Sequence, residues 1–477
     1  MKHLKRISCI LLITVILTAI PAGCSDGMPR LDPQRPVTIT VWHAYGGAIM
    51  NAFEAAVTEF NETEGARRGV IVESIGFGHI NEVGRAVMAS ARREIGSRDM
   101  PNIFASYVDV VFELEQLDPD LLVDLSDYFT ERQQREYVES FIEAGRIGLN
   151  GELRVFPVAI ASEVLLINET DWLPFASANN LMFEDLSTME GVARVAQIYY
   201  NWSGGKAFFG RDAMANFFIN ASKQFGTEIF YVESGEVTIN VNAEVMRRIW
   251  DYYYVPYISG YYLSFGRFRS DDARVGDIIA YVASTASASF FPTEVTSGGQ
   301  VRPITAKVLP PPIFEGGTRV MVQQGPGMVV TSATPEQEYA SLIFLKWFTE
   351  AGTNIQFAAL SGYIPVKRQA LDYDLIRTLA YESGIYFSAI TDDTLRVTIE
   401  SAKIYEMYST KAFRGRGPAR VVLERNLQDK AAADREAVIS LINGGAAREA
   451  AIAQFNTQEN FNNWLEDLTN QLNEAVS

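Results

Sequence analysis

The chain has 477 residues, 48% of them hydrophobic, and a formal net charge of −17. This length provides for two or three domains with large cores, and the acidic charge disfavours nucleic acid and anionic lipid as partners. With 2 cysteines and 3 histidines, the sequence offers no basis for a disulfide framework, a cysteine metal cluster or Cys–His nucleophilic catalysis. We therefore expect no metal ion, no cofactor and no nucleic-acid partner.

The N-terminus has the order of a bacterial export signal. Basic residues precede a mostly apolar run over residues 10–20, and small residues then lead to Cys24. This run is far shorter than the roughly 20 residues that a membrane-spanning helix needs. Its small-small-Cys ending resembles the lipobox of bacterial lipoproteins, in which the cysteine is acylated and becomes the first residue, although Pro21 stands where that motif usually has Leu. An ordinary signal peptide followed by a chance cysteine is the alternative.

The expected processing leaves a protein attached through one thiol. We predict that residues 1–23 are a signal peptide, that Cys24 is lipidated, and that the polar, proline-rich residues 24–36 are a tether. Cleavage removes three basic residues and Cys9, so that 38 basic residues face 58 acidic ones and the net charge becomes −20. The expected location is the extracytoplasmic face of the cell membrane.

The body begins with alternating strand and helix patterns. Residues 37–42 and 70–75 are short β-branched runs, and helical spacing of apolar residues follows each of them, over residues 49–60 and 81–94. Strands and helices alternating at these lengths predict crossover units and a mostly parallel sheet, which places the chain in the α/β class.

Further elements follow along the chain. Residues 151–168 form an extended stretch interrupted by Pro157, and residues 185–254 have a mainly helical pattern. Thr334, Pro335 and Gln337 form the signature of a capped helix start. Additional strands are expected at residues 278–282, 307–309 and 328–331.

Several sequence motifs occur in an order that is similar to a known family. They are VTITVWHAYGG, RDMPNIFASY, GELRVFPVAIASEVLLIN, GPGMVVTSATPEQEYASLIFLKWFTE, FAALSGYIPVKRQAL and FRGRGPARVVLERNL. The ordered set resembles the extracellular solute-binding proteins of family 1, which are carbohydrate receptors of ABC importers. The last motifs look most like the receptors for glycerol phosphate compounds. Asn102 departs from the family, which usually has Asp there.

The resemblance implies a two-lobed periplasmic-binding-protein type II-like fold with an interlobe ligand cleft and crossing hinge strands. It divides the chain into a first lobe of residues 37–155 and 305–352 and a second lobe of residues 156–304 and 353–477. It also implies a monomer that binds a sugar, oligosaccharide or glycerol phosphate compound without changing it and delivers it to the transmembrane permease subunits.

Candidate ligand contacts come from the same resemblance and from local sequence context. Arg can bind phosphate or paired hydroxyls through its planar fork, and Tyr or Trp can stack on a sugar face. The candidates are Trp42, Tyr107, Asp109, Ser162, Glu163, Trp202, Ser284, Gly325, Tyr363 and Arg420.

Other roles remain open for several of these side chains. Asp109 could cap the helix that follows it, and Arg420 could belong to a solvated basic cluster. Tyr363 and Trp42 could pack in a core. The nine aromatic residues within residues 250–268 could form a sugar platform or the core of a lobe.

Two other functions remain possible from the sequence. A surface-anchored glycoside hydrolase would need two carboxylates about 5–10 Å apart across a cleft. Residues 113/115 and 271/272 are adjacent acidic pairs, but neighbours at these spacings more often form a solvated face. A structural surface lipoprotein would need no ligand cleft.

Overall fold

The computed structural model describes residues 28–147, 151–233 and 235–477. Cys24 and the expected signal peptide lie outside the described residues, as does the beginning of the expected tether. Within the described ranges, no helix combines the length and the apolar character that crossing a membrane requires.

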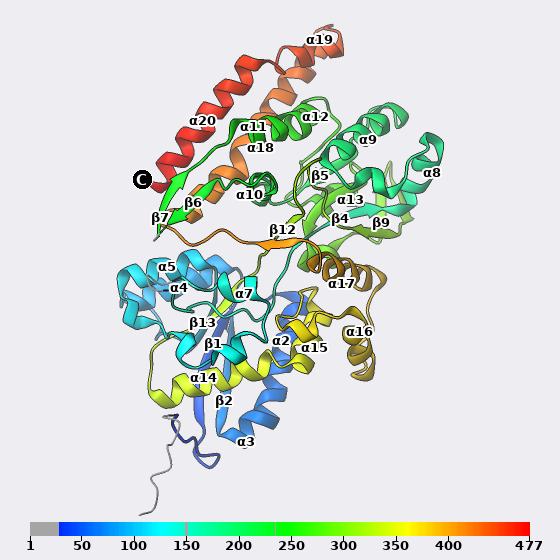
Figure 1. The fold of residues 1–477 in the computed structure, drawn as a ribbon. Coiled ribbons are helices and arrows are strands. Elements are labelled where there is room, and N and C mark those ends of the chain that lie inside the picture. The colour runs from blue at the N-terminus through cyan, green and yellow to red at the C-terminus, as the bar shows by residue number, and fades with distance from the viewer. Residues whose placement is uncertain (1–27, 148–150, 234) are drawn as a thin grey trace, which may run out of the picture.

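The first lobe contains a four-stranded sheet with the order β13-β3-β1-β2 (Figure 1). Its strands are β1 (Val37–His43), β2 (Val70–Gly76), β3 (Ile103–Ser106) and β13 (Gly327–Val330). β1 is parallel to β2 and β3, as the alternating pattern predicts, whereas β13 returns antiparallel to β3.

Helices cover both faces of this sheet and enclose a core that includes many phenylalanines. They are α2 (Gly47–Phe60), α3 (Ala66–Arg68), α4 (Ile80–Ala91), α5 (Val108–Leu117), α6 (Glu131–Gln134), α7 (Glu139–Glu143), α14 (Pro335–Phe348), α15 (Ala351–Ser361) and α16 (Tyr373–Glu382). The predicted start of α14 is confirmed. Thr334 Oγ1 accepts the N–H of Gln337 at 3.3 Å, and Pro335 occupies the first helical turn.

The second lobe contains a mixed sheet with the order β11-β4-β8-β5. β4 (Glu163–Asn168) is antiparallel to both β11 (Ala306–Leu309) and β8 (Ala280–Ser284), and β5 (Phe209–Arg211) is parallel to β8. All six residues of β4 are buried. This burial agrees with the continuous apolar run that predicted an extended segment ending at residue 168.

The helices of this lobe include a long C-terminal pair, α18 and α20, which pack on each other. The helices are α8 (Glu169–Asn179), α9 (Met189–Trp202), α10 (Met214–Gln224), α11 (Ala243–Ile249), α12 (Val255–Ile258), α13 (Arg269–Arg274), α18 (Arg416–Asn443), α19 (Arg448–Ala453) and α20 (Gln458–Val476). Two short antiparallel ladders are β6 (Phe230–Glu233) with β7 (Glu236–Ile239) and β9 (Glu294–Ser297) with β10 (Gln300–Pro303). The mainly helical pattern predicted for residues 185–254 missed β5, β6 and β7, which are too short to show a clear period.

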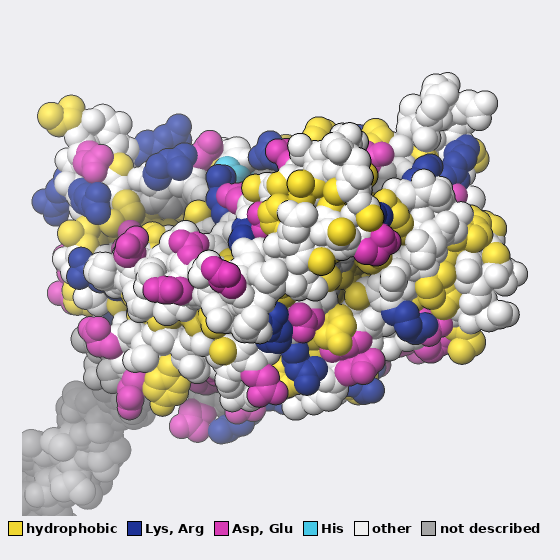
Figure 2. Space-filling model, turned by 90° about the horizontal axis from the view of Figure 1, so that it is seen from above, with side chains coloured by type: hydrophobic (Ala, Val, Ile, Leu, Met, Phe, Trp, Pro, Cys, Tyr) yellow, Lys and Arg dark blue, Asp and Glu magenta, His cyan; other side chains and the backbone are white. Residues whose placement is uncertain are grey.

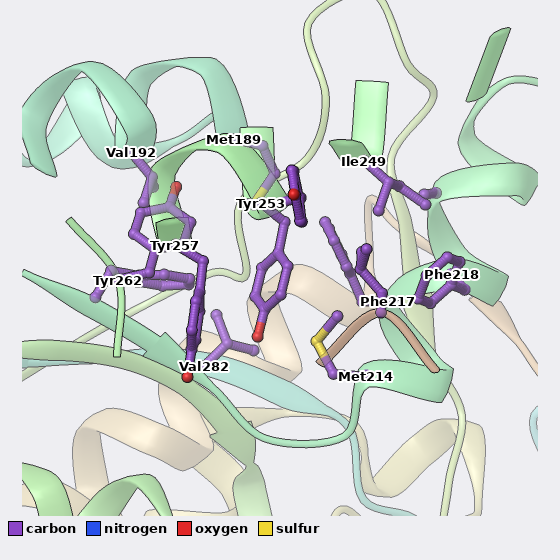
Figure 3. Close-up of a cluster of buried hydrophobic side chains, with 14 of the residues drawn as sticks. Met189, Val192, Met214, Phe217, Phe218, Ile249, Tyr253, Tyr257, Tyr262 and Val282 are labelled. Atoms are coloured by element: carbon purple, nitrogen blue, oxygen red, sulfur yellow. The ribbon is translucent and has the colours of Figure 1, made fainter. Parts of the chain in front are cut away.

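The aromatic segment at residues 250–268 builds the core of the second lobe. Tyr253, Tyr257 and Tyr262 are buried, and the ring of Tyr253 lies between the other two and Phe217 of α10 (Figure 3). Phe265 is instead 86% exposed. Of the two roles considered for this segment, the packing therefore favours the core of the lobe over a sugar platform.

Crossing segments join the lobes. β12 (Val320–Val322) pairs in parallel with β14 (Glu406–Tyr408) between the two sheets (Figure 1). Residues 156–162 form a second crossing segment. Its Ala161 pairs with Gln324, which directly follows β12 and Gln323, and its Ile160 pairs with Ile364. The chain thus passes between the lobes along paired strands, an arrangement typical of a hinge.

The helices after residue 352 pack differently from the division expected from the sequence. The ring of Phe357 in α15 makes an edge-on contact with Tyr45 and also packs against Phe348. α15 therefore contacts the first lobe. α17 (Ala389–Ala402) packs on β11 and on the 3₁₀ turn Thr285–Phe290 of the second lobe, while its Leu395 joins the first-lobe core. The first lobe therefore extends well beyond residue 352.

The close approach of the backbone at Gly145 to that at Val155 can be tested by substitution. A Cβ atom built on Gly145 would lie 1.8 Å from the carbonyl oxygen of Val155, which is backbone and has no rotamer to change. We expect Gly145→Ala to lower the free energy of unfolding by roughly 1–3 kcal/mol, measured by urea titration. Gly352→Ala is the matched control because its Cβ would meet nothing within 4 Å. Equal stability of the two variants would contradict the close approach.

Candidate ligand-binding site between the lobes

A cavity of about 520 Å³ lies between the lobes and is lined by residues from both of them. Tyr107 and Asp109 contribute from the start of α5 in the first lobe. Asn216 of α10 and Arg420 of α18 contribute from the second lobe, and Gly325 contributes from a crossing segment. The volume lies within the usual range for small-molecule sites.

Three helices begin at this cavity. The second residue of α5, the third of α10 and the first two of α18 are among the lining residues. In each of these three helices, the side chain of the N-cap residue accepts no hydrogen bond from the first turn. In α10 the N–H of Ala215 is accepted by Glu424. The positive ends of the dipoles of α5 and α18 favour negatively charged or strongly hydrogen-bond-accepting ligand atoms.

Two backbone conformations with positive φ set the directions of α10 and α18. Gly415 precedes α18 with φ of 79°, and a Cβ there would lie 2.5 Å from the carbonyl oxygen of Ala475. Ala213 precedes α10 with φ of 53°, a region that costs a non-glycine residue energy. Backbone strain of this kind is often found at binding sites, where it fixes a side chain such as Asn216.

Arg416 and Arg420 stand one turn apart on α18, and both line the cavity. Burial, reinforced by the neighbouring charge of Arg420, lowers the pKa of Arg416 to about 10. Burial also lowers the pKa of Arg420. Both guanidinium groups stay protonated at neutral pH, so the cavity holds two desolvated cations.

Among the described residues, the contacts of the Arg416 cation are long ones. Its Nε donates to Thr410 Oγ1 at 3.2 Å, and its Nη1 lies 3.7 Å from Asp109 Oδ1 in the other lobe. Asp109 Oδ1 is buried and has no hydrogen-bond partner. The N-cap residue of α5 is Tyr107, and Asp109 is the second residue of the helix. Asp109 therefore does not occupy the N-cap position.

A buried network lies directly behind the cavity. Arg211 of β5 donates to Glu163 Oε2 of β4 at 2.7 Å, and both side chains are at most 3% exposed. Asn216 donates to Glu163 Oε1 and to Gln324 Oε1, both at 3.0 Å, and accepts from Arg420 at 2.7 Å. Glu163 thus holds Asn216, which in turn holds the Arg420 guanidinium in place.

Ser162 and Tyr363 lie beside the cavity and not among its lining residues. The Ser162 hydroxyl donates to the carbonyl of Val322 at 2.6 Å, which joins two crossing segments. Tyr363 stacks on Phe357, and burial, together with the nearby Tyr107, raises the pKa of its hydroxyl above the normal value. A Cβ on Gly325 would lie 3.4 Å from the Tyr363 ring, so the absent side chain permits this close packing.

Three other candidates lie away from the cavity. Trp42 is 2% exposed and packs against Phe77 in the core beside β1. Trp202 ends α9, is 48% exposed and contacts Phe175. Ser284 ends β8 opposite Glu163, and its carbonyl accepts a hydrogen bond from Ser287.

Sequence reasoning missed several polar lining residues. Asn216 follows no motif, and its role depends on the direction that Ala213 gives to α10. Gln323 and Gln324 directly precede Gly325, which was selected, so their position in the crossing segment was a usable signal. Arg416 was not selected and entered only as a member of the solvated basic cluster that was one alternative for Arg420, although its spacing of four from Arg420 places both on one helix face.

A family model described as bacterial extracellular solute-binding protein matches residues 55–379, which is more than half of the chain. The chain belongs to this family. No curated protein matches this solute-binding protein's sequence.

Solved structures of distant sequence share the fold of this solute-binding protein. The cyclic alpha-maltosyl-1,6-maltose binding protein from Arthrobacter globiformis has 16% identity and a TM-score of 0.66, with 92% of this chain and 99% of that chain covered. UgpB from Mycobacterium tuberculosis, in complex with glycerophosphocholine, has 17% identity, a TM-score of 0.64 and coverage of 92% and 100%. The maltotriose binding protein of Thermus thermophilus, bound with maltotriose, has 15% identity, a TM-score of 0.58 and coverage of 92% and 100%. The two-lobed fold is therefore as predicted.

The described lining of the cavity contains one carboxylate, whereas glycoside hydrolysis commonly uses two. Asp109 is the single acidic side chain among the described residues that line it. No group of three or more His, Cys, Asp or Glu side chains in the described ranges is arranged to hold a metal ion. The family and its structural neighbours are likewise binding proteins.

The buried ion pair behind the cavity gives a stability test. Glu163→Ala would leave the Arg211 cation buried without its carboxylate, so we expect the free energy of unfolding to fall by roughly 3–5 kcal/mol. Arg135→Ala is the control, because the Arg135–Glu131 pair has side chains that are 72% and 86% exposed and should change stability by less than about 1 kcal/mol. Urea unfolding followed by fluorescence measures both. Similar losses in the two variants would contradict a specific role for the buried pair.

Proposed function

We propose that this chain is the extracytoplasmic receptor of an ABC importer, which binds a carbohydrate or a glycerol phosphate-type solute between its lobes and delivers it to the permease. The observation that carries the proposal is the interlobe cavity, where hydrogen-bonding side chains of both lobes and of the crossing segments face one space. Asn216, Gln324 and Arg420 are oriented for a polar ligand by hydrogen bonds to one another.

Ligand binding at this position would stabilise a closed arrangement of the lobes. A solute that contacts Tyr107 or Asp109 in the first lobe and Arg420 in the second lobe binds best when the two sides are close. The ligand thus shifts the population toward the closed form by its differential affinity for the two forms. The permease would recognise that closed form.

The attachment to the membrane is part of the proposal. Acylation of Cys24 after removal of residues 1–23 would anchor the receptor on the extracytoplasmic face, with residues 24–36 as the tether. A monomer suffices, because one chain supplies both sides of the cavity. Mass spectrometry of the mature N-terminus tests the anchor, and an unmodified Cys24 in the membrane fraction would contradict it.

Solute binding can be tested with protein that lacks residues 1–24. Sugars, oligosaccharides, polyols and glycerol phosphodiesters are screened for a rise in unfolding temperature, and at 100 times its dissociation constant a true ligand stabilises by about 2.7 kcal/mol. Intact ligand recovered afterwards supports a receptor, whereas a cleaved product supports a hydrolase. Absence of any shift would favour a structural lipoprotein.

Arg420 provides the site-directed part of this test. We expect Arg420→Ala to weaken binding of the identified solute by roughly tenfold or more, measured by calorimetry, because a hydrogen bond to a charged group is lost. Arg425→Ala is the matched control, since Arg425 lies on the exposed side of the same helix. Equal affinities of the two variants would place the binding site elsewhere.

A further inference from the structure

The interlobe cavity has a defined sum of charges. Among the described residues that line it, Asp109, Arg416 and Arg420 are the side chains that are charged at neutral pH. Tyr107 and Tyr408 also line it, and burial raises the pKa of both hydroxyls, so both remain neutral. The lining therefore carries one net positive charge.

The charged groups behind the lining have partners of their own. Glu163 and Arg211 form a buried pair and neutralise each other. Glu424 lies outside the lining, one turn after Arg420, and its charge acts on that guanidinium. Its carboxylate also accepts the N–H of Ala215 at 2.9 Å, so the positive end of α10 offsets part of its charge. The start of α18 adds a further positive partial charge, because Gly417 of its first turn opens into the cavity.

Buried acceptors without partners show where the remaining ligand atoms belong. Gln323 is 7% exposed, lines the cavity, and its Oε1 has no hydrogen-bond partner. Asp109 Oδ1, on the first-lobe side of the cavity, is likewise buried without a hydrogen-bond partner. Unpaired buried acceptors are costly and are satisfied when a ligand supplies donors such as hydroxyl groups.

The exterior of the protein is electrostatically different from this cavity. The whole chain has a net charge of −17, and acidic and basic side chains are interspersed on the face shown in Figure 2. A net positive charge in the cavity is therefore a local arrangement against the overall charge. The desolvation cost of bringing an anion into it is lowest when the charges of ligand and lining cancel.

We propose that the solute carries a single negative charge and several hydroxyl groups, and that Asp109 determines this charge selectivity. This inference rests on the proposed function. The oxyanion, a phosphodiester or a carboxylate, binds Arg416, Arg420 and the first turn of α18, and hydroxyl groups of the solute donate to Gln323 and Asp109. A dianion exceeds the net charge of the lining, and a neutral sugar leaves one cation without a counter-charge.

The role of Asp109 follows from its place opposite Arg416. Its carboxylate lies 3.7 Å from the guanidinium, at a distance that leaves room for a ligand oxygen to compete for the same N–H groups. It cancels one of the two positive charges without forming a close hydrogen bond to it. Asp109 is thus a specificity residue, while Arg416 and Arg420 supply the attraction.

The test compares ligand preferences within each protein variant. Calorimetry at pH 8 measures dissociation constants for glycerophosphoglycerol and glucuronate as monoanions, glycerol 3-phosphate and glucose 6-phosphate as dianions, and glucose and maltose as neutral solutes. We expect the wild type to bind one monoanion roughly tenfold or more tightly than its dianionic and neutral counterparts. The phosphodiester and carboxylate arms show which oxyanion is recognised.

Two substitutions change the charge of the lining in opposite directions. Asp109→Asn should shift the preference toward the dianion by roughly tenfold, because the net charge becomes +2. Arg416→Gln should remove the preference for a charged solute, because the net charge becomes zero. Glu113→Gln is the control, since Glu113 is exposed on the same helix as Asp109. The ratio of two affinities in one sample does not depend on its folded fraction.

The outcomes separate this inference from the function on which it rests. Tighter binding of neutral sugars by the wild type, or a preference that Asp109→Asn leaves unchanged, overturns the charge selectivity and leaves the receptor function intact. Failure of every neutral, monoanionic and dianionic solute to bind overturns both. A shift of preference in opposite directions in the two variants supports the inference.

Discussion

The buried ion pair between Glu163 and Arg211 holds together the parts of the chain that build the interlobe site. Glu163 begins β4 directly after a crossing segment, and Arg211 ends β5 two strands away in the same sheet. Their 2.7 Å contact leaves Glu163 Oε1 free to accept from Asn216 at 3.0 Å. One carboxylate therefore couples the sheet, the crossing segment and the start of α10.

This coupling continues into the ligand cavity because Asn216 has both a donor and an acceptor. Its amide group donates to Glu163 and Gln324, and its carbonyl oxygen accepts from Arg420. Such a chain of hydrogen bonds is stronger in a low dielectric than in water, and it is costly to break at any point. The Arg420 guanidinium is thus oriented before a ligand arrives, which lowers the entropy that binding must overcome.

The sequence predicts those parts of the structure that depend on local chemistry. The capped start of α14 at Thr334 and the parallel pairing of β1 with β2 both follow from residue type and spacing. Tyr107 and Asp109 line the cavity because they directly follow β3, and the carboxyl ends of parallel strands form the crevice of an α/β sheet. Their position just after a strand was therefore sufficient to predict that Tyr107 and Asp109 line the cavity.

The missed and misplaced residues depend on contacts distant in the sequence. Trp42 and Trp202 carry the right chemistry for a sugar site, yet each packs against a neighbouring aromatic ring away from the cavity. The role of Asn216 depends on Glu163, which lies 53 residues earlier, and no local pattern encodes that pairing. The first lobe extends beyond residue 352 for the same reason, because Phe357 packs against Tyr45.

The arrangement of charge also explains why the cations lie on α18 and not on a loop. A guanidinium on the first turn of a 28-residue helix has a rigid base, and that helix is itself packed against α10 and α20. Arg416 and Arg420 repel each other there, and burial adds to the cost, which together lower the pKa of Arg416. Two buried cations side by side carry an energetic cost that Asp109, 3.7 Å from Arg416, and Glu424, one turn after Arg420, offset in part. The proposed anionic solute would relieve that cost, so the electrostatic strain of the two cations would contribute to its affinity.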